Sequence, residues 1–196
     1  MHTQRQATVL VLAAVLCICF MSPVLSQEVG RLSYLEGDVQ LLRDGELRDG
    51  TNIDIGETIL NLDVIQTGFD GYVEVNLTAP SNVTVRIQEN AAYYVDQTVD
   101  GNRAAVTVRL LTGRLEMSVS QLSPDSSLSV ETQTATLGVR GTEFGVLIAP
   151  DEGALFGIQE GRVEVAAGGR RVAAEAGTAV EALPNRRPRT ETVPGG

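Results

Sequence analysis

Cysteine, histidine, lysine and tryptophan are almost missing from this 196-residue chain, and their absence limits what it can do. Its one histidine and two cysteines are His2, Cys17 and Cys19, all within the first 26 residues. If that segment is removed, the remaining chain has no thiol nucleophile, no imidazole base and no disulfide. A zinc site of the usual Cys/His kind is excluded as well. We therefore expect no bound metal, no cofactor and no enzymatic activity.

The N-terminal segment has the pattern of a signal peptide. Arg5 and the free amine precede an apolar run over residues 7–20, and Val24-Leu25-Ser26 suits cleavage before Gln27. We predict a signal peptide over residues 1–26 and a periplasmic or secreted protein. Retention as an uncleaved anchor is the alternative, because residues 7–25 approach the ~20 that a membrane span needs. A lipoprotein is disfavoured, since the residues before Cys17 make a poor lipobox.

Basic charge is also scarce. The formal net charge is −10, with 25 Asp and Glu against 15 arginines. A chain this acidic is a poor partner for nucleic acid. The simplest account of the charge is solubility.

Short runs with a two-residue period are plentiful. Tyr72–Thr78 and Val83–Ile87 alternate apolar and polar residues, as half-buried strands do. Asp44-Gly45 and Asp100-Gly101-Asn102 are hairpin signals, and no segment has a long helical period. We predict one all-β domain over residues 27–183, built of short antiparallel strands as a two-sheet sandwich or roll. Residues 184–196 hold almost nothing to bury, and we expect a disordered tail there.

A weak internal repeat suggests how the strands are arranged. Gly30-Arg31-Leu32, Gly113-Arg114-Leu115 and Gly161-Arg162-Val163 each open a strand, and Gly37-Asp38-Val39 does much the same. The repeat predicts stacked hairpins that bury one shared apolar row. Its irregular spacing argues against a long regular solenoid.

The stretch from Leu128 to Ile148 stands at the centre of this pattern. Gly138 and Gly141 interrupt it, and a glycine inside a strand pattern marks a bulge or a close backbone approach. By parity Arg140 falls on the same face as Phe144. We therefore expect Arg140 to be a buried structural clamp, held by a carboxylate or carbonyls.

The same stretch resembles a known family. Thr132 to Phe144, reading TQTATLGVRGTEF, is similar to the signature of the FecR-type domain, in which T-P-T-A leads into V-R-G-T-E-F; Gln133 replaces the proline. Val64 to Val75 resembles a second family segment. The structural signature is Val139, Arg140, Gly141, Thr142, Glu143 and Phe144. By parity Arg140 and Glu143 face opposite ways, so we do not expect them to act on one substrate.

The resemblance implies a non-catalytic, extracytoplasmic module. Familiar members carry a cytoplasmic anti-sigma segment, a membrane span and this domain outside. Few residues precede the apolar run here, so we do not expect that whole layout. The first hypothesis is a binding module of the bacterial envelope for a protein or glycan, with its binding residues unknown and no membrane span after cleavage. The second is a regulatory subunit that relays a signal to a separately encoded membrane partner.

Three further possibilities rest on single patterns. A carboxylate-dependent glycan hydrolase would need two acids across a cleft, and no pattern pairs them. The acidic residues near Asp44 and Asp49 lack the spacing of a calcium loop, so turn formation explains them better. Two glycosylation sequons, at Asn76 and Asn82, matter only in a eukaryotic secretory pathway.

Overall fold

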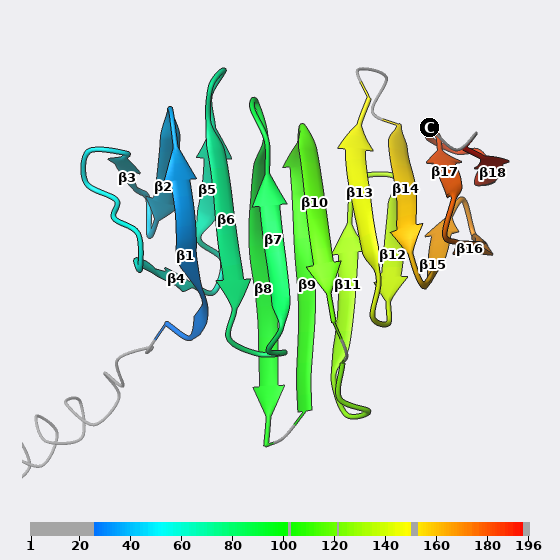
Figure 1. Ribbon diagram of the computed structural model, residues 1–196, viewed down its shortest axis with the longest axis horizontal. Coiled ribbons are helices and arrows are strands. Elements are labelled where there is room, and N and C mark those ends of the chain that lie inside the picture. The colour runs from blue at the N-terminus through cyan, green and yellow to red at the C-terminus, as the bar shows by residue number, and fades with distance from the viewer. Residues whose placement is uncertain (1–25, 102, 121, 150–152, 194–196) are drawn as a thin grey trace, which may run out of the picture.

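The computed structural model describes residues 26–101, 103–120, 122–149 and 153–193, which form two nine-stranded β-sheets packed face to face (Figure 1). No helix occurs in these ranges, and none of their segments is a helix able to cross a membrane. The predicted all-β, two-sheet sandwich is confirmed. The proposed signal peptide lies outside the described residues except for Ser26.

Sheet A faces the viewer in Figure 1. In spatial order it contains β18 (Arg189–Thr192), β17 (Thr178–Ala182), β14 (Ala154–Glu160), β13 (Glu143–Ile148), β10 (Arg114–Val119), β7 (Val83–Ile87), β6 (Tyr72–Leu77), β1 (Glu28–Glu36) and β4 (Thr58–Leu60). All of its strand pairs are antiparallel.

Sheet B lies behind it. In the same spatial direction it contains β16 (Arg170–Glu175), β15 (Arg162–Ala167), β12 (Ala135–Val139), β11 (Ser127–Glu131), β9 (Arg103–Thr112), β8 (Ala92–Asp100), β5 (Val64–Thr67), β2 (Val39–Arg43) and β3 (Glu46–Asp49). Its pairs are antiparallel except for β9 and β11, which are parallel.

Consecutive hairpins alternate between the sheets. From β6 onward the chain places β6–β7 in sheet A, β8–β9 in sheet B, β10 in sheet A, β11–β12 in sheet B, and so on to β17–β18. The strands therefore progress along the long axis from the N-terminal to the C-terminal end (Figure 1). This is the stacked-hairpin arrangement that the weak repeat predicts, and its left-handed glycines Gly37, Gly113 and Gly161 each stand where the chain changes sheet.

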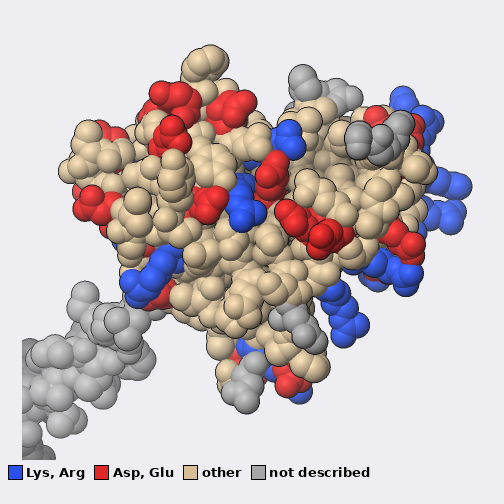
Figure 2. Space-filling model, in the orientation of Figure 1, with Lys and Arg blue, Asp and Glu red and all other residues tan. Residues whose placement is uncertain are grey.

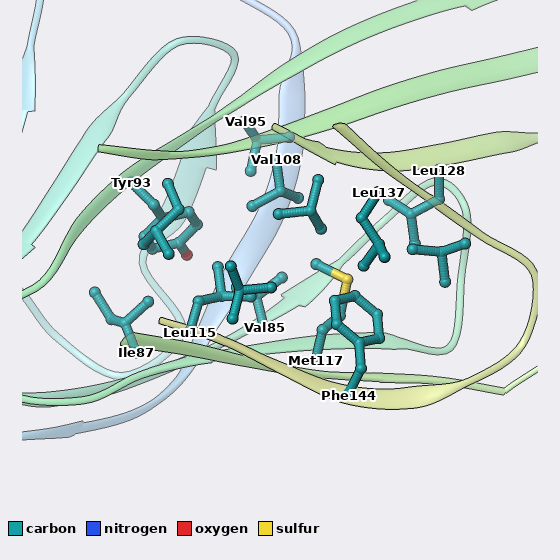
Figure 3. Packing of buried hydrophobic residues seen from close by; sticks show 14 of the residues in the cluster. Val85, Ile87, Tyr93, Val95, Val108, Leu115, Met117, Leu128, Leu137 and Phe144 are labelled. Carbon is teal, nitrogen blue, oxygen red and sulfur yellow. The ribbon is translucent and has the colours of Figure 1, made fainter. Parts of the chain in front are cut away.

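The core lies between the two inner faces. Sheet A contributes Val85, Met117 and Phe144, and Figure 3 shows them meeting side chains of sheet B such as Tyr93 and Leu137. These five side chains are at most 1 % exposed. The alternation of buried and exposed positions along each strand is what the two-residue period requires.

The C-terminal segment differs from the disordered tail expected from sequence. Strand β18 pairs with β17, Arg186 donates its backbone N–H to the carbonyl of Leu183, and Pro188 is buried. Backbone pairing holds this segment although β18 buries no side chain of its own. Residues 194–196 lie outside the described ranges.

Candidate functional site

The Val139–Phe144 signature forms the corner where the chain passes from β12 in sheet B to β13 in sheet A. Gly141 makes this corner with a left-handed backbone, φ 72°. A Cβ at this position would stand 2.6 Å from the carbonyl oxygen of Ser120. Neither the conformation nor the space therefore admits a side chain.

Arg140 is exposed, and the expectation that it is a buried clamp is wrong. Val139, Thr142 and Phe144 are buried at the same corner, so the two-residue period shifts by one across it. Parity holds within one strand, whereas here the inward direction reverses as the chain changes sheet. Within the described residues Arg140 has no hydrogen bond and no ion pair from its side chain.

A groove of about 1010 Å³ opens beside Arg140 on the outer face of sheet B. It runs over β12, β15 and β16 and the start of β11, and its lining residues are Ser126, Ser127, Leu128, Gly138, Val139, Arg140, Gly141, Gly161, Arg162, Val163, Glu164, Ala173, Glu175 and Ala176. Gly138 faces outward between larger neighbours, and a Cβ there would meet only the Glu164 carbonyl, at 3.9 Å. No side chain therefore fills the groove at this position.

Two of the three arginines around this groove form ion pairs within the described residues, and the third does not. Arg162 forms an ion pair with its cross-strand partner Glu175, and Arg171 donates to Glu164 at 3.1 Å. All four side chains are more than half exposed, so these pairs add little stability. Of the three arginines, Arg140 alone lacks a counter-ion within the described residues. The Arg140 groove can therefore accept an anionic group, most naturally a carboxylate that matches the guanidinium fork.

Comparison with known proteins gives this corner a family context. The profile of the family described as "FecR protein" matches residues 63–164, more than half of the chain, including the whole signature. The chain belongs to the FecR family. The matched region runs from just before β5 into β15, so β16, which carries Glu175 on the far wall of the groove, lies beyond it.

Solved structures agree on the fold. Two crystal structures, at 1.65 Å and 2.50 Å, of a protein from Parabacteroides distasonis ATCC 8503 described as a "putative anti-sigma factor" resemble this chain with a TM-score of 0.55 and 17% sequence identity. The similarity covers 66% of this chain and 59% of that one, so this FecR-family chain matches less than two thirds of its structural neighbour. No curated protein matches the chain.

Glu143, the other charged residue of the FecR signature, lies away from the groove. It faces outward from sheet A, where it is paired in register with Ser118 on β10 and Glu160 on β14. Arg140 faces outward from sheet B. The two side chains therefore point to opposite surfaces of the sandwich and cannot contact one small ligand together.

The groove brings together residues that sequence reasoning did not single out as a site. Gly161-Arg162-Val163-Glu164 was notable only as a repeat unit, and Glu175 had no local signal at all. These residues meet Arg140 only because β15 pairs with β12 and β16 pairs with β15. The one local hint was Gly138, a glycine inside a strand pattern.

The acidic residues near the N-terminal end form turns. Asp44 has a left-handed backbone in the β2–β3 hairpin. Asp49 accepts hydrogen bonds from the hydroxyl of Thr51, at 2.6 Å, and from its backbone N–H, and these bonds lower the pKa of the Asp49 carboxyl. Within the described ranges, no three or more acidic, histidine or cysteine side chains cluster closely enough to hold a metal ion.

A second hollow, of about 540 Å³, lies on the outer face of sheet A. Gly145 and Gly157, paired in register on β13 and β14, form its floor, and Leu147 and Leu155 stand beside them. Arg114 at its margin already donates to Glu116, at 3.0 Å. This hollow therefore offers apolar contact without an unpaired charge, which makes it a weaker candidate than the Arg140 groove.

Proposed function

We propose that this FecR-family chain is a non-catalytic binding module of the bacterial envelope, which holds an acidic segment of a partner protein in the Arg140 groove. The observation that carries the proposal is the exposed guanidinium of Arg140, which has no partner among the described residues, beside a groove of about 1010 Å³. An arginine at the rim of an open groove offers a planar fork of donors to a carboxylate and needs no rearrangement to do so.

The groove's lining favours a protein segment over a glycan. None of its lining residues is aromatic, so no ring is available to stack on a sugar. Alternating Arg and Glu side chains along the walls suit the mixed polar contacts of a peptide. Export to the envelope is part of the proposal, and its support is the signal-peptide pattern of residues 1–26.

Site-directed photo-crosslinking tests this binding role. A photoreactive residue at Ser127, inside the groove, should trap a partner protein in cells of the native host, whereas one at Ser118, on the opposite face, should not. Arg140→Glu should abolish the Ser127 cross-link by repelling the carboxylate. Arg103→Glu, an equal charge change at an exposed site on β9 outside the groove, should preserve it.

The outcome that rejects the proposal is equally specific. If the Ser127 cross-link persists in Arg140→Glu, or if Arg103→Glu removes it to the same extent, the partner does not use the Arg140 groove. If Ser127 yields no cross-linked product in the native host, the groove does not bind a protein there.

A second candidate function is regulation, in which the chain relays a signal to a separately encoded membrane partner. Its support is the FecR family match together with the fold shared with the Parabacteroides protein. Deleting the gene should then change transcription of a defined set of genes. The wild-type gene should restore that transcription and Arg140→Glu should not, whereas an unaltered transcript profile in the deletion strain rejects this role.

A further inference from the structure

Both sheets of the sandwich are open at both ends. Sheet B ends at β3 and β16, and sheet A ends at β4 and β18. Within the described residues no strand pairs with the outer side of these four. An unpaired strand edge offers a row of N–H and C=O groups to another chain, and it is commonly protected by charge. The two ends of this molecule carry opposite charge.

The charge difference follows the long axis. Residues 26–67, from β1 to β5, contain nine carboxylates and three arginines, whereas residues 162–193 contain six arginines and four glutamates. Figure 2 shows acidic side chains gathered over the N-terminal end and arginines projecting from the C-terminal end. Several of these arginines have no ion pair within the described residues: Arg170, Arg186, Arg187 and Arg189.

The strand directions make the two ends of sheet B compatible. Between β3 and β16 every neighbouring pair is antiparallel except β9–β11, so the number of reversals is odd and the two edge strands run in opposite directions. A second copy displaced along the long axis would therefore present its β3 antiparallel to β16. In that arrangement Asp49, which ends β3, approaches Arg170 and Arg171, which begin β16.

We propose that the chain self-associates head to tail, with β3 of one copy extending sheet B of the next copy at β16. Two N-terminal ends in contact would bring their excess carboxylates together, and two C-terminal ends in contact would bring their excess arginines together. Like charges disfavour both symmetric arrangements, while the head-to-tail pairing joins opposite charges. Leu47, whose side chain is 60 % exposed on β3, would also gain apolar cover.

This arrangement is heterologous, so the assembly always keeps a free β3 edge at one end and a free β16 edge at the other, and it grows with concentration. The proposed interface and the Arg140 groove share only strand β16, of which Ala173 and Glu175 line the groove. The proposal does not depend on the proposed function, because it rests on strand edges and charge rather than on the groove.

Sedimentation velocity on protein purified from cells that express the full chain tests the proposal. The weight-average mass should rise with concentration at about 0.01 M salt. It should fall toward the monomer at about 0.5 M salt, where screening shortens the reach of charges from about 30 Å to a few ångström. Asp54 is exposed in the connection between β3 and β4. Two charge-reversed variants then locate the interface: Asp49→Arg with Asp54→Arg, and Arg170→Glu with Arg171→Glu.

Each variant alone should remain monomeric, because its two edges then carry the same charge. An equimolar mixture should associate again, since every basic edge meets an acidic one. The control is Asp100→Arg with Asp125→Arg, which makes the same charge change on exposed residues away from both edges and should associate like the wild type. The Arg170/Arg171 variant leaves the Asp49 turn untouched, so it gives a reading even if the Asp49 variant folds poorly.

Three results overturn the proposal. One is a wild-type protein that stays monomeric at low salt across the concentration range. Another is association that survives in either variant, which would place the interface elsewhere. The third is a mixture of two folded variants that stays monomeric.

Discussion

Arg43 and Asp63 form a two-pronged ion pair at the N-terminal end of the sandwich. Nε of Arg43 donates to Oδ1 of Asp63 at 3.0 Å, and Nη2 donates to Oδ2 at 2.6 Å. Asp63 is 3 % exposed, and it also accepts the backbone N–H of Leu60. Nη2 of Arg43 also donates to the backbone carbonyl of Thr58. The pair thus ties β2 to β4 and to the residue that precedes β5.

Breaking this pair should destabilise the fold. Arg43→Ala strands the buried carboxylate of Asp63, and we expect the free energy of unfolding to fall by about 3 kcal/mol or more. Arg43→Lys should recover only part of the loss, because an ammonium cannot reproduce the planar fork. Urea denaturation measures both. Arg31→Ala, which removes an exposed pair with Glu28, serves as the control and should cost about 0.5 kcal/mol or less.

A change of less than about 1 kcal/mol in Arg43→Ala would show that water or a neighbouring donor replaces the guanidinium. Arg43 would then be no more important than the exposed Arg31.

The sequence predicts an arginine clamp at Arg140, whereas the structure has one at the partly buried Arg43. Arg43 shares the inward face of β2 with Val39 and Leu41, and that parity is legible because all three lie in one strand. Arg140 and Phe144, in contrast, lie on either side of Gly141, where the chain changes sheet. The two-residue period shows which residues face inward along one strand. It does not show which residues face inward after the chain has passed to the other sheet.

The same limit separates the predictable part of the fold from the rest. The strand Val83–Ile87 and the Asp44-Gly45 hairpin depend on near neighbours and are evident from sequence. Which sheet each hairpin joins depends on corners such as Gly161, which look like ordinary turns. The Arg140 groove is harder still to predict from the sequence. Glu175 lies near Arg140 only because β12 pairs with β15 and β15 pairs with β16.

Two glycines with the same backbone conformation allow strain and close contact to be measured separately. Gly141 has φ 72° and Gly45 has φ 81°, but a Cβ at Gly45 would meet nothing within 4 Å. Gly45→Ala should therefore lose roughly 1 kcal/mol, the cost of a left-handed alanine. Gly141→Ala should lose at least about 1 kcal/mol more, since its Cβ meets the Ser120 carbonyl. Equal losses in thermal or urea unfolding would show that the corner relaxes to admit the methyl group.

The stability of the N-terminal end should depend on pH through Glu57. Arg48 donates to Glu57 at 2.7 Å, and this hydrogen bond, with the positive charges of Arg48 and Arg43, lowers the pKa of the Glu57 carboxyl. A carboxyl whose pKa is lower in the folded state stabilises the protein above its unfolded pKa, about 4.3. That stabilisation is lost as the pH falls through the folded pKa.

Comparing wild type with Glu57→Gln isolates this contribution. Wild type should be more stable at pH 6, and the difference in unfolding free energy should shrink as the pH is lowered below about 4, because protonated glutamic acid and glutamine are both neutral. Urea unfolding at several pH values gives the profile. A difference that stays constant down to low pH would mean that Glu57 acts through packing rather than charge.

Arg140 should contribute nothing measurable to stability, in contrast to Arg43. Its side chain is exposed and has no polar partner within the described residues, so Arg140→Ala removes no ion pair and no buried contact. Surface changes of this kind usually stay within ±0.5 kcal/mol. Arg140→Glu should behave similarly, and its thermal unfolding should coincide with that of the wild type. That result would leave any loss of partner binding in Arg140→Glu attributable to the groove itself. A substantial drop in unfolding temperature for Arg140→Ala would instead show that the guanidinium holds the β12–β13 corner together.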